Sequence, residues 1–426
     1  MSFLNRILVS LKNIYQADIP LREKTEFLFH AGLSKLGFQF VYYATKIIID
    51  LFRIKLKRRM KYHAKLMRIE KMNASVLNSI SDSDLIRIIE AFTKAKIDQT
   101  GQSQPYQVGG EWAVMVAEYH KDIRNALEVR DLDGIRRILS NFGRDKVSHG
   151  LQLYSALPDS WINKIAYLNY ANKAYHNWLS LTDLPEAALE YPRNIGNFPG
   201  IQSGESVIPI LSFRLSYFGY KIYQLTQSIQ HPTISEIGGG FGAIPYHMLK
   251  YTDFQLTYID FDIPEMCVIA SYFLISAFPE KRICLYGECS DLKNSDIKGY
   301  DIIIMPNYAI KDLPDKWSDL VFNSHSLGEM NRSSVNEYLV QIGRICKRYF
   351  LHANDEKSRF YWDPYDGYKF KKRVILSNLT AQLPECNFKK VYRIPEVIFS
   401  DGWFENDFFE NLYYEYLYER KGEVLF

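Results

Sequence analysis

The chain has 426 residues, about two to three domains by the usual length of a domain, and 47% of them are apolar, so it can bury a large core. Its net charge of +3 is nearly balanced, which excludes a general nucleic-acid binder, because such a protein would be strongly basic. The five cysteines form no CxxC pair and show no metal-finger spacing. An odd count without a signal peptide predicts reduced cysteines in a cytoplasmic protein.

The first part of the chain is predicted to be helical. No glycine or proline occurs between Phe38 and Thr100, and the polar residues from Lys35 to Lys57 recur at the spacing of one helical stripe. Ser81, with Asp84 three residues later, resembles the capping box of another helix. We therefore assign residues 1–180 to a helical N-terminal domain.

An apolar helix that runs into a basic cluster has two interpretations. The stretch RIKLKRRMK, residues 53–61, holds six basic residues in nine. Such a helix could lie on an anionic membrane surface, or it could pack in the helical domain and leave its basic end in water. Lys46 and Asp50 interrupt the apolar run and argue against a transmembrane helix. Residues 35–61 are thus a candidate peripheral membrane contact.

Residues 181–232 are predicted to connect two domains through a loop and a lid helix. The stretch 183–205 is rich in proline, glycine and asparagine, as structured loops are. Loops at this place often cover a pocket, so Asn197 and Arg214 are candidate substrate or cofactor contacts. An ordinary interdomain turn is the alternative role for Asn197.

From residue 233 to 426, short apolar runs alternate with helical patterns. Strand-like runs such as TISEI, YIDFD, DLVFN and RYFLHAN are separated by helices, which predicts a doubly wound, mostly parallel, Rossmann-like α/β sheet. The last two runs, KKVYRIPEVIF and NLYYEYLYER, have no clear helix between them. We expect them to form an antiparallel strand pair that closes one edge of the sheet.

A glycine-rich turn follows the first of these strands, in the stretch TISEIGGGFGAIPYHML. A strand, a glycine turn and a helix expose backbone N–H groups and let a nucleotide or nucleoside approach closely. The spacing Gly238-x-Gly240-x-x-Ala243 fits the dinucleotide fingerprint. An acid at the strand end and a GxGxG pattern instead favour S-adenosylmethionine, as does the closing strand pair. The candidate cofactor contacts here are Glu236, Gly238, Gly239, Gly240 and Gly242.

The second strand ends in YIDFDIPE, which offers two acids for the ribose of the cofactor. A carboxylate at that place can accept hydrogen bonds from both ribose hydroxyls. Strand alternation puts Asp260 and Asp262 on the same face, so periodicity does not choose between them. We prefer Asp262 because it is nearer the carboxyl end, where ligands bind; capping the helix that starts at Pro264 is its alternative role.

The later strands supply candidates for the adenine contact and for catalysis. The adenine contact should follow the third strand, but two runs compete, one ending at Glu288 and one at Asn307. The stretch DLVFNSHSLGEM supplies Asn323 as a cofactor contact, and His325 and Glu329 as candidate general bases. Capping the next helix is the alternative role for Glu329, and packing is that of His325.

The stretch YFLHAND forms a second polar cluster, with His352, Asn354 and Asp355. Asn354 and Asp355 are candidate substrate contacts. With Asp319 or Glu329 the cluster could hold a divalent cation, but its spacing is not a metal signature, so we predict no metal site.

Taken together, EIGGGFGAIPYHML, YIDFDIPE and DLVFNSHSLGEM resemble a bacterial family of sugar O-methyltransferases. The stretches IGNFPG and SFRLSYFGYKIYQL are also similar to that family, and the resemblance covers roughly residues 140–420. The chain departs from the family pattern where Phe198 and Pro199 are transposed, where Ile263 replaces a leucine, and at His325. An Asp-Leu-Pro at the ribose acid also occurs in plant small-molecule O-methyltransferases, which supports Asp262.

The resemblance implies an S-adenosylmethionine-dependent O-methyltransferase that acts on a sugar hydroxyl of a glycan or of a lipid- or nucleotide-linked precursor. It would work in the cytoplasm, at the inner membrane face if the basic helix binds lipid. Two other functions compete: an NAD-dependent oxidoreductase, and a scaffold with a methyltransferase fold and no catalytic activity.

Overall fold

The computed structural model describes residues 68–69, 80–149, 151, 161–192, 194–203, 206–250, 254–289, 292, 295–356, 360–363, 369–372, 374–376, 387–396, 398 and 413–421. The proposed membrane contact at residues 35–61 lies outside these residues. No helix within the described ranges is long and apolar enough to cross a membrane.

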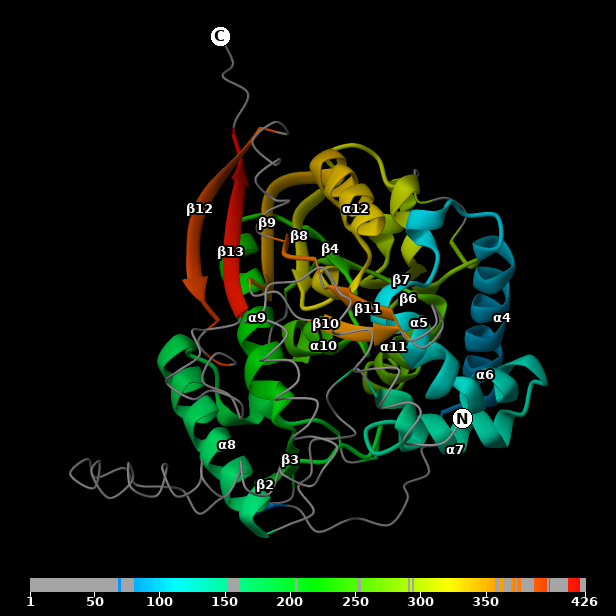
Figure 1. Ribbon diagram of the computed structural model, residues 1–426, viewed down its shortest axis with the longest axis horizontal. Helices are drawn as coiled ribbons and strands as arrows, with labels where there is room; N and C mark the ends of the chain where they lie inside the picture. Colours follow the sequence, from blue (N-terminus) through cyan, green and yellow to red (C-terminus); the bar gives the residue numbers. More distant parts are fainter. Residues whose placement is uncertain are drawn as a thin grey trace.

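Between Asp82 and Leu181 the described residues are mainly helical, as predicted (Figure 1). Arg68–Ile69, inside the stretch that is also predicted to be helical, form a short strand instead. Ser81 caps the first of the helices, since its hydroxyl accepts a hydrogen bond from the Asp84 N–H at 3.1 Å. This confirms the predicted helix start. The helices are α4 (Asp82–Gln99), α5 (Gly110–Glu118), α6 (Lys121–Glu128), α7 (Leu132–Ser140) and α8 (Trp161–Leu181), with short 3₁₀ turns η1 (Gln104–Tyr106), η2 (Lys146–Ser148) and η3 (Glu186–Leu189).

A small antiparallel sheet joins Arg68–Ile69, ahead of these helices, to the stretch that follows them, and one long helix then leads to the main sheet. The small sheet pairs β1 (Arg68–Ile69), β2 (Ile201–Ser203) and β3 (Ser206–Ile208). Helix α9 (Leu211–Thr226) follows and is buried along most of its length. The predicted domain boundaries at residues 180 and 232 stay predictions.

The main sheet has the order β12-β13-β9-β8-β4-β5-β7-β6. All its described neighbours pair in parallel except β13, which is antiparallel to both β12 and β9, so the predicted closing pair is confirmed. The strands are β4 (Thr233–Ile237), β5 (Thr257–Asp262), β6 (Ile283–Leu285), β7 (Ile302–Pro306), β8 (Ser318–Ser324), β9 (Cys346–Asp355), β12 (Phe388–Pro395) and β13 (Tyr413–Arg420). A separate hairpin pairs β10 (Phe360–Asp363) with β11 (Lys369–Lys372).

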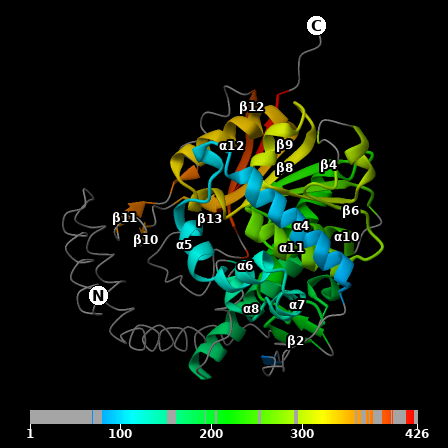
Figure 2. The same ribbon diagram turned by 90° about the vertical axis from the view of Figure 1, so that its right-hand side faces the viewer.

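Helices cover both faces of the sheet, which gives a three-layer α/β fold (Figure 2). Ile234 and Phe322 on one face pack in a cluster that also holds buried residues of the helices before the sheet. Ile259 and Val321 on the other face pack with the last long helix. The connecting helices are α10 (Ala243–Lys250), α11 (Pro264–Ala277) and α12 (Arg332–Ile345), with 3₁₀ turns η4 (Ser295–Gly299), η5 (Asn307–Asp312) and η6 (Leu327–Glu329).

The cysteines differ from the expectation of a fully reduced set. Cys284, at the centre of β6, and Cys289, in the turn that follows, are joined as a disulfide across a Cα–Cα distance of 6.3 Å. The turn brings the two Cα atoms within the range that a disulfide needs, which the spacing of five residues did not suggest. Cys267 and Cys346 are free thiols, and Cys386 lies outside the described residues.

Candidate functional site

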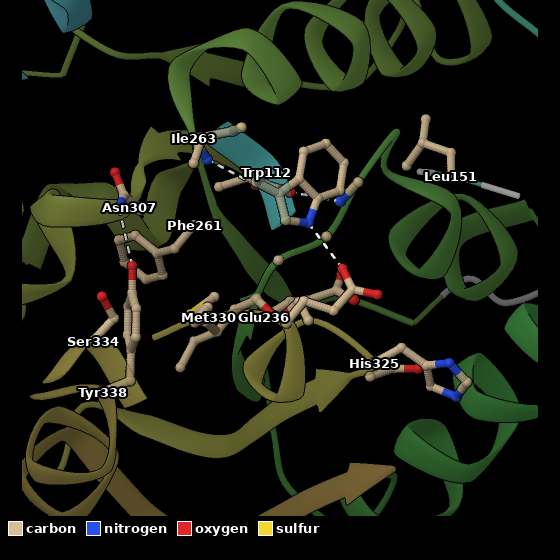
Figure 3. Close-up of a pocket in the computed structure, with 18 of the residues that line it drawn as sticks. Trp112, Leu151, Glu236, Phe261, Ile263, Asn307, His325, Met330, Ser334 and Tyr338 are labelled. Carbon is tan, nitrogen blue, oxygen red and sulfur yellow. Dashed lines mark hydrogen bonds between the residues drawn. The ribbon is translucent and has the colours of Figure 1, made fainter. Parts of the chain in front are cut away.

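A pocket opens at the carboxyl ends of β4, β5, β7 and β8 (Figure 3). The space within it measures about 1160 Å³ when the open solvent at its mouth is counted. Ligands bind at this edge in open α/β sheets, because loops from several strands converge there.

The glycine turn forms the floor of this pocket, with Gly238, Gly239 and Gly240 in the lining. Gly238 has a φ of +78°, a left-handed conformation that favours glycine, and a Cβ there would collide with the Ser326 hydroxyl. Gly242 does not line the pocket. It has a φ of +82°, and a Cβ there would lie 2.6 Å from Leu274 Cδ1. The structure therefore assigns Gly242 to close packing of the turn against α11 rather than to a cofactor contact.

Three carboxyl groups meet at the ends of β4 and β5. Glu236 and Asp260 are direct partners in the strand register, and both are buried. The Asp262 Oδ2 atom accepts the Gly240 N–H at 2.8 Å, and the Asp260 Oδ1 atom accepts the Gly239 N–H at 3.2 Å. Asp262 lines the pocket whereas Asp260 does not, which agrees with the preference for Asp262 as the acid that faces a ligand.

Burial shifts the acid–base equilibria of these groups. It raises the pKa of Glu236 to about 8, although a 2.6 Å hydrogen bond from the Tyr258 hydroxyl acts in the opposite direction. It raises the pKa of Asp262 to about 7 and the pKa of Asp260 well above its usual range. A positive charge in the pocket would stabilise the ionised carboxylates and reverse these shifts.

Arg214 is the sole lysine or arginine among the described residues that line the pocket. It projects from α9 with 8% of its surface exposed. Its charge lowers the pKa of both Glu236 and Glu396, against the larger effect of burial. The predicted contact residue Arg214 is thus in the pocket, between two buried carboxyl groups.

His325 lies in the pocket wall just beyond the end of β8, with its backbone in the left-handed region at a φ of +63°. Its Nε2 atom is 2.8 Å from Glu396 Oε2, and its ring stacks on Tyr413 at a centroid distance of 4.0 Å. Burial raises the pKa of Glu396 to about 7, and Arg214 Nε lies 3.9 Å from the other carboxyl oxygen. A histidine held by a buried carboxylate is an arrangement that can accept a proton.

Sequence reasoning missed Glu396. This residue directly follows β12, which runs parallel to β9 because both are antiparallel to β13. The end of β12 therefore reaches the same edge of the sheet as His325. Its place directly after the strand-like run VYRIP indicates an acid at a strand end, but only the strand order shows that this strand ends beside His325.

Glu329 lines the pocket and does not cap α12. Its Oε2 atom accepts a 2.9 Å hydrogen bond from the Trp112 indole N–H (Figure 3), and the Asn331 side chain caps α12. The proposed capping role of Glu329 is therefore wrong. Trp112 was not singled out in the sequence.

The two competing runs for the adenine contact separate clearly. Strand β7 inserts between β5 and β6, so Asn307 after β7 lies in the pocket lining, where its Nδ2 donates to the Tyr338 hydroxyl at 3.0 Å. Glu288 lies after the edge strand β6 and pairs with Arg87 Nε at 2.7 Å. The structure therefore does not bring Glu288 to the pocket.

Four other predicted residues also lie outside the described lining. Asn323 is buried and donates to the Ile237 carbonyl at 2.7 Å, and its Oδ1 accepts from Asn354 Nδ2 at 2.8 Å. These two amides brace the ends of β8 and β9 rather than face a ligand. Asp355 is buried at the end of β9, and the Asn197 amide pairs with Arg144 and Asn141.

The possible cation cluster is not assembled. His352 is buried and stacked on Tyr416. Asp319 lies at the start of β8, whereas Asn354 lies near the end of the neighbouring parallel strand β9, at the other edge of the sheet. Within the described ranges, no three histidine, cysteine, aspartate or glutamate side chains are placed to hold a metal ion.

No protein-family model matches the sequence, and no curated protein matches it either. Solved structures with similar folds include the 1,6-didemethyltoxoflavin-N1-methyltransferase of Burkholderia thailandensis (13% identity, TM-score 0.31, 49% of this chain and 79% of that one). Others are a SAM-dependent methyltransferase of Aquifex aeolicus (12%, 0.30, 48% and 89%) and the ribosomal protein L11 methylase of Lactobacillus delbrueckii (12%, 0.29, 49% and 78%). Because these TM-scores are low, the description of the fold and of the site rests on the strand order and on the pocket lining alone.

Proposed function

We propose that this protein is an S-adenosylmethionine-dependent methyltransferase. The observation that carries the proposal is the charge of the pocket: Glu236, Asp262 and Glu329 line it, and Arg214 is the sole lysine or arginine in the described lining. A sulfonium cofactor brings positive charge to such a site, where it would stabilise carboxylates that burial otherwise drives toward the neutral form.

The same pocket suits a dinucleotide poorly. A pyrophosphate binds to the free N–H groups of a glycine turn at a helix N-terminus. Here the Gly239 and Gly240 N–H groups already donate to Asp260 and Asp262. Any carboxylate of the lining that is ionised would also repel the phosphates. The antiparallel closing pair, by which methyltransferases usually depart from nucleotide dehydrogenases, supports the same choice.

The pocket residues have chemistry that fits the parts of the cofactor. Glu236 would pair with its ammonium group, Asp262 would accept from the ribose hydroxyls, and Asn307 would contact the adenine. When bound, the cofactor supplies an activated methyl group, so much of the catalysis is positioning. His325, held by Glu396 at 2.8 Å, would take the proton of the acceptor hydroxyl.

We infer that the acceptor is a sugar hydroxyl of a glycan or of a lipid- or nucleotide-linked precursor. The support is the resemblance of three motifs to sugar O-methyltransferases and the presence of a candidate base, which an alcohol needs as a nucleophile.

Calorimetry with S-adenosylhomocysteine and with NAD tests the cofactor. We expect the first to bind and the second not to bind; binding of NAD alone would establish the oxidoreductase alternative. Incubation with candidate glycans and S-adenosylmethionine, read as the mass gain of one methylene unit, tests the transfer. Cofactor binding without any transfer would support a non-catalytic scaffold.

Replacing His325 tests the base. We expect His325→Ala to lower turnover by roughly 10²–10⁴-fold while the affinity for S-adenosylhomocysteine is retained. The rate of the unaltered enzyme should rise through near-neutral pH, because the Glu396 carboxyl has a pKa of about 7 and holds a cationic imidazole best when ionised. His231→Ala is the control, since that histidine contacts Thr257 outside the pocket lining. Full turnover in His325→Ala would contradict the role.

A further inference from the structure

A segment far ahead of the sheet forms one wall of the pocket. Pro105, Val108 and Trp112 lie in the lining together with the glycine turn. The segment is anchored by Tyr106, whose hydroxyl donates to Glu337 Oε1 at 2.8 Å and whose carbonyl accepts from Asn307 Nδ2 at 3.1 Å. The helical region therefore contributes directly to the site.

Trp112 and Glu329 close the gap between this wall and the turn after β8. We call the pair the clasp; its hydrogen bond joins Nε1 to Oε2 at 2.9 Å (Figure 3). Gly110 allows the approach, because it has a φ of +62° and a Cβ there would collide with the Glu329 carbonyl. Helix α5 thus begins directly against the turn that carries Glu329.

The clasp adds two kinds of negative potential to the pocket. The indole ring is the side chain whose π face attracts a cation most strongly. Glu329 is a carboxylate bound to that ring, and Glu236 and Asp262 line the same cavity. This concentration of carboxylate and aromatic groups favours a ligand that carries a positive charge.

We propose that the clasp recognises the positive charge of the sulfonium, so that Trp112 and Glu329 make the site prefer the charged methyl donor to the neutral thioether product. This inference rests on the proposed function. It makes Glu329 a specificity residue rather than the base, and it would favour exchange of spent cofactor for fresh donor after each turnover.

Two probes separate charge recognition from simple structural support. Sinefungin carries a cationic amine where the donor has its sulfonium, and S-adenosylhomocysteine is neutral there. We expect Trp112→Leu to lower the affinity for sinefungin about tenfold more than the affinity for S-adenosylhomocysteine, as measured by calorimetry. Glu329→Gln keeps an acceptor for the indole N–H but removes the negative charge. It should therefore also lower the affinity for sinefungin more than the affinity for S-adenosylhomocysteine.

Val116→Ala is the matched control, because Val116 lies on α5 but is not part of the pocket lining. It should leave the ratio of the two affinities unchanged. Equal losses for both probes in Trp112→Leu, or an unchanged ratio in either clasp variant, would overturn the proposal. If the unaltered protein binds neither probe, the proposed function itself fails.

Discussion

Glu236 shows how a single side chain can couple cofactor binding to protonation. It is 3% exposed, faces Asp260 across the strand pair, and shares its surroundings with Asp262, Tyr258 and Arg214. Burial dominates, so its pKa is raised to about 8. A raised carboxyl pKa means that the protein without ligand loses stability as the pH rises from about 4.3, the value in an unfolded chain, to about 8.

We therefore expect the affinity for S-adenosylhomocysteine to increase as the pH rises through 7 to about 8, because the ligand ammonium pairs with the ionised carboxylate. The gain should approach tenfold per pH unit below the pKa if about one proton is released. Calorimetry in two buffers with different heats of ionisation measures that proton. Glu236→Gln should bind more weakly and lose most of this dependence. An affinity that is flat between pH 6 and about 8.5 in the unaltered protein would contradict the coupling.

At the scale of elements, the glycines of the turn between β4 and α10 have two different roles, lining the pocket and allowing close packing of the turn. Gly238 and Gly240 line the pocket, whereas Gly242 lets the turn pack against Leu274 of α11. Because Gly240 also has a φ of +65°, a bulky residue there would strain the turn as well as crowd the pocket. Loss of ligand binding in a Gly240 variant is consequently weak evidence for a ligand contact.

Gly242→Ala tests the packing role. We expect it to lower the free energy of unfolding by about 1–3 kcal/mol, because the backbone conformation and the contact with Leu274 both oppose a Cβ. Urea unfolding measures this loss. Gly101→Ala is the control, since its Cβ would meet its nearest neighbour at an ordinary 3.8 Å. Equal stability of the two variants would argue against a packing role for Gly242.

Across the whole molecule, the helical region is attached to the sheet by both apolar and charged contacts. Leu85 and Ile88 of α4 belong to the same buried cluster as Phe273 of α11. Lys96 Nζ lies 3.0 Å from Glu265 Oε1, and that carboxylate is almost fully buried at the start of α11, three residues after Asp262. The attachment thus lies next to the pocket.

Lys96→Ala would leave the Glu265 carboxylate without this partner. We expect a loss of about 1–2 kcal/mol in the free energy of unfolding, at the lower end for a buried charge because the Lys96 side chain is one third exposed. Lys94→Ala removes an exposed pair with Asp98 on the same helix and should cost less than about 0.5 kcal/mol. Thermal or urea unfolding compares them, and a larger loss in Lys94→Ala would contradict this account.

The sequence by itself determined most elements of the main sheet, from residue 233 onward. The strand, glycine turn and helix around Gly238, and the closing pair of strands, follow from side-chain periodicity and from turn chemistry, which are local properties. The preference for Asp262 over Asp260 rests on a local rule as well, because the residue nearer the carboxyl end of a strand is nearer the ligand edge; Asp262 lines the pocket, and its contact with a ligand stays a prediction.

Only the tertiary structure decided which distant residues share the pocket. Asn307 reaches it and Glu288 does not, because β7 inserts between β5 and β6. Glu396 reaches His325 because β13 lies antiparallel between β9 and β12, so that β12 runs parallel to β9 and ends at the same edge. Trp112 reaches Glu329 across 217 positions of sequence. Strand order and the docking of helices arise from contacts between remote segments, and no local pattern in the chain encodes them.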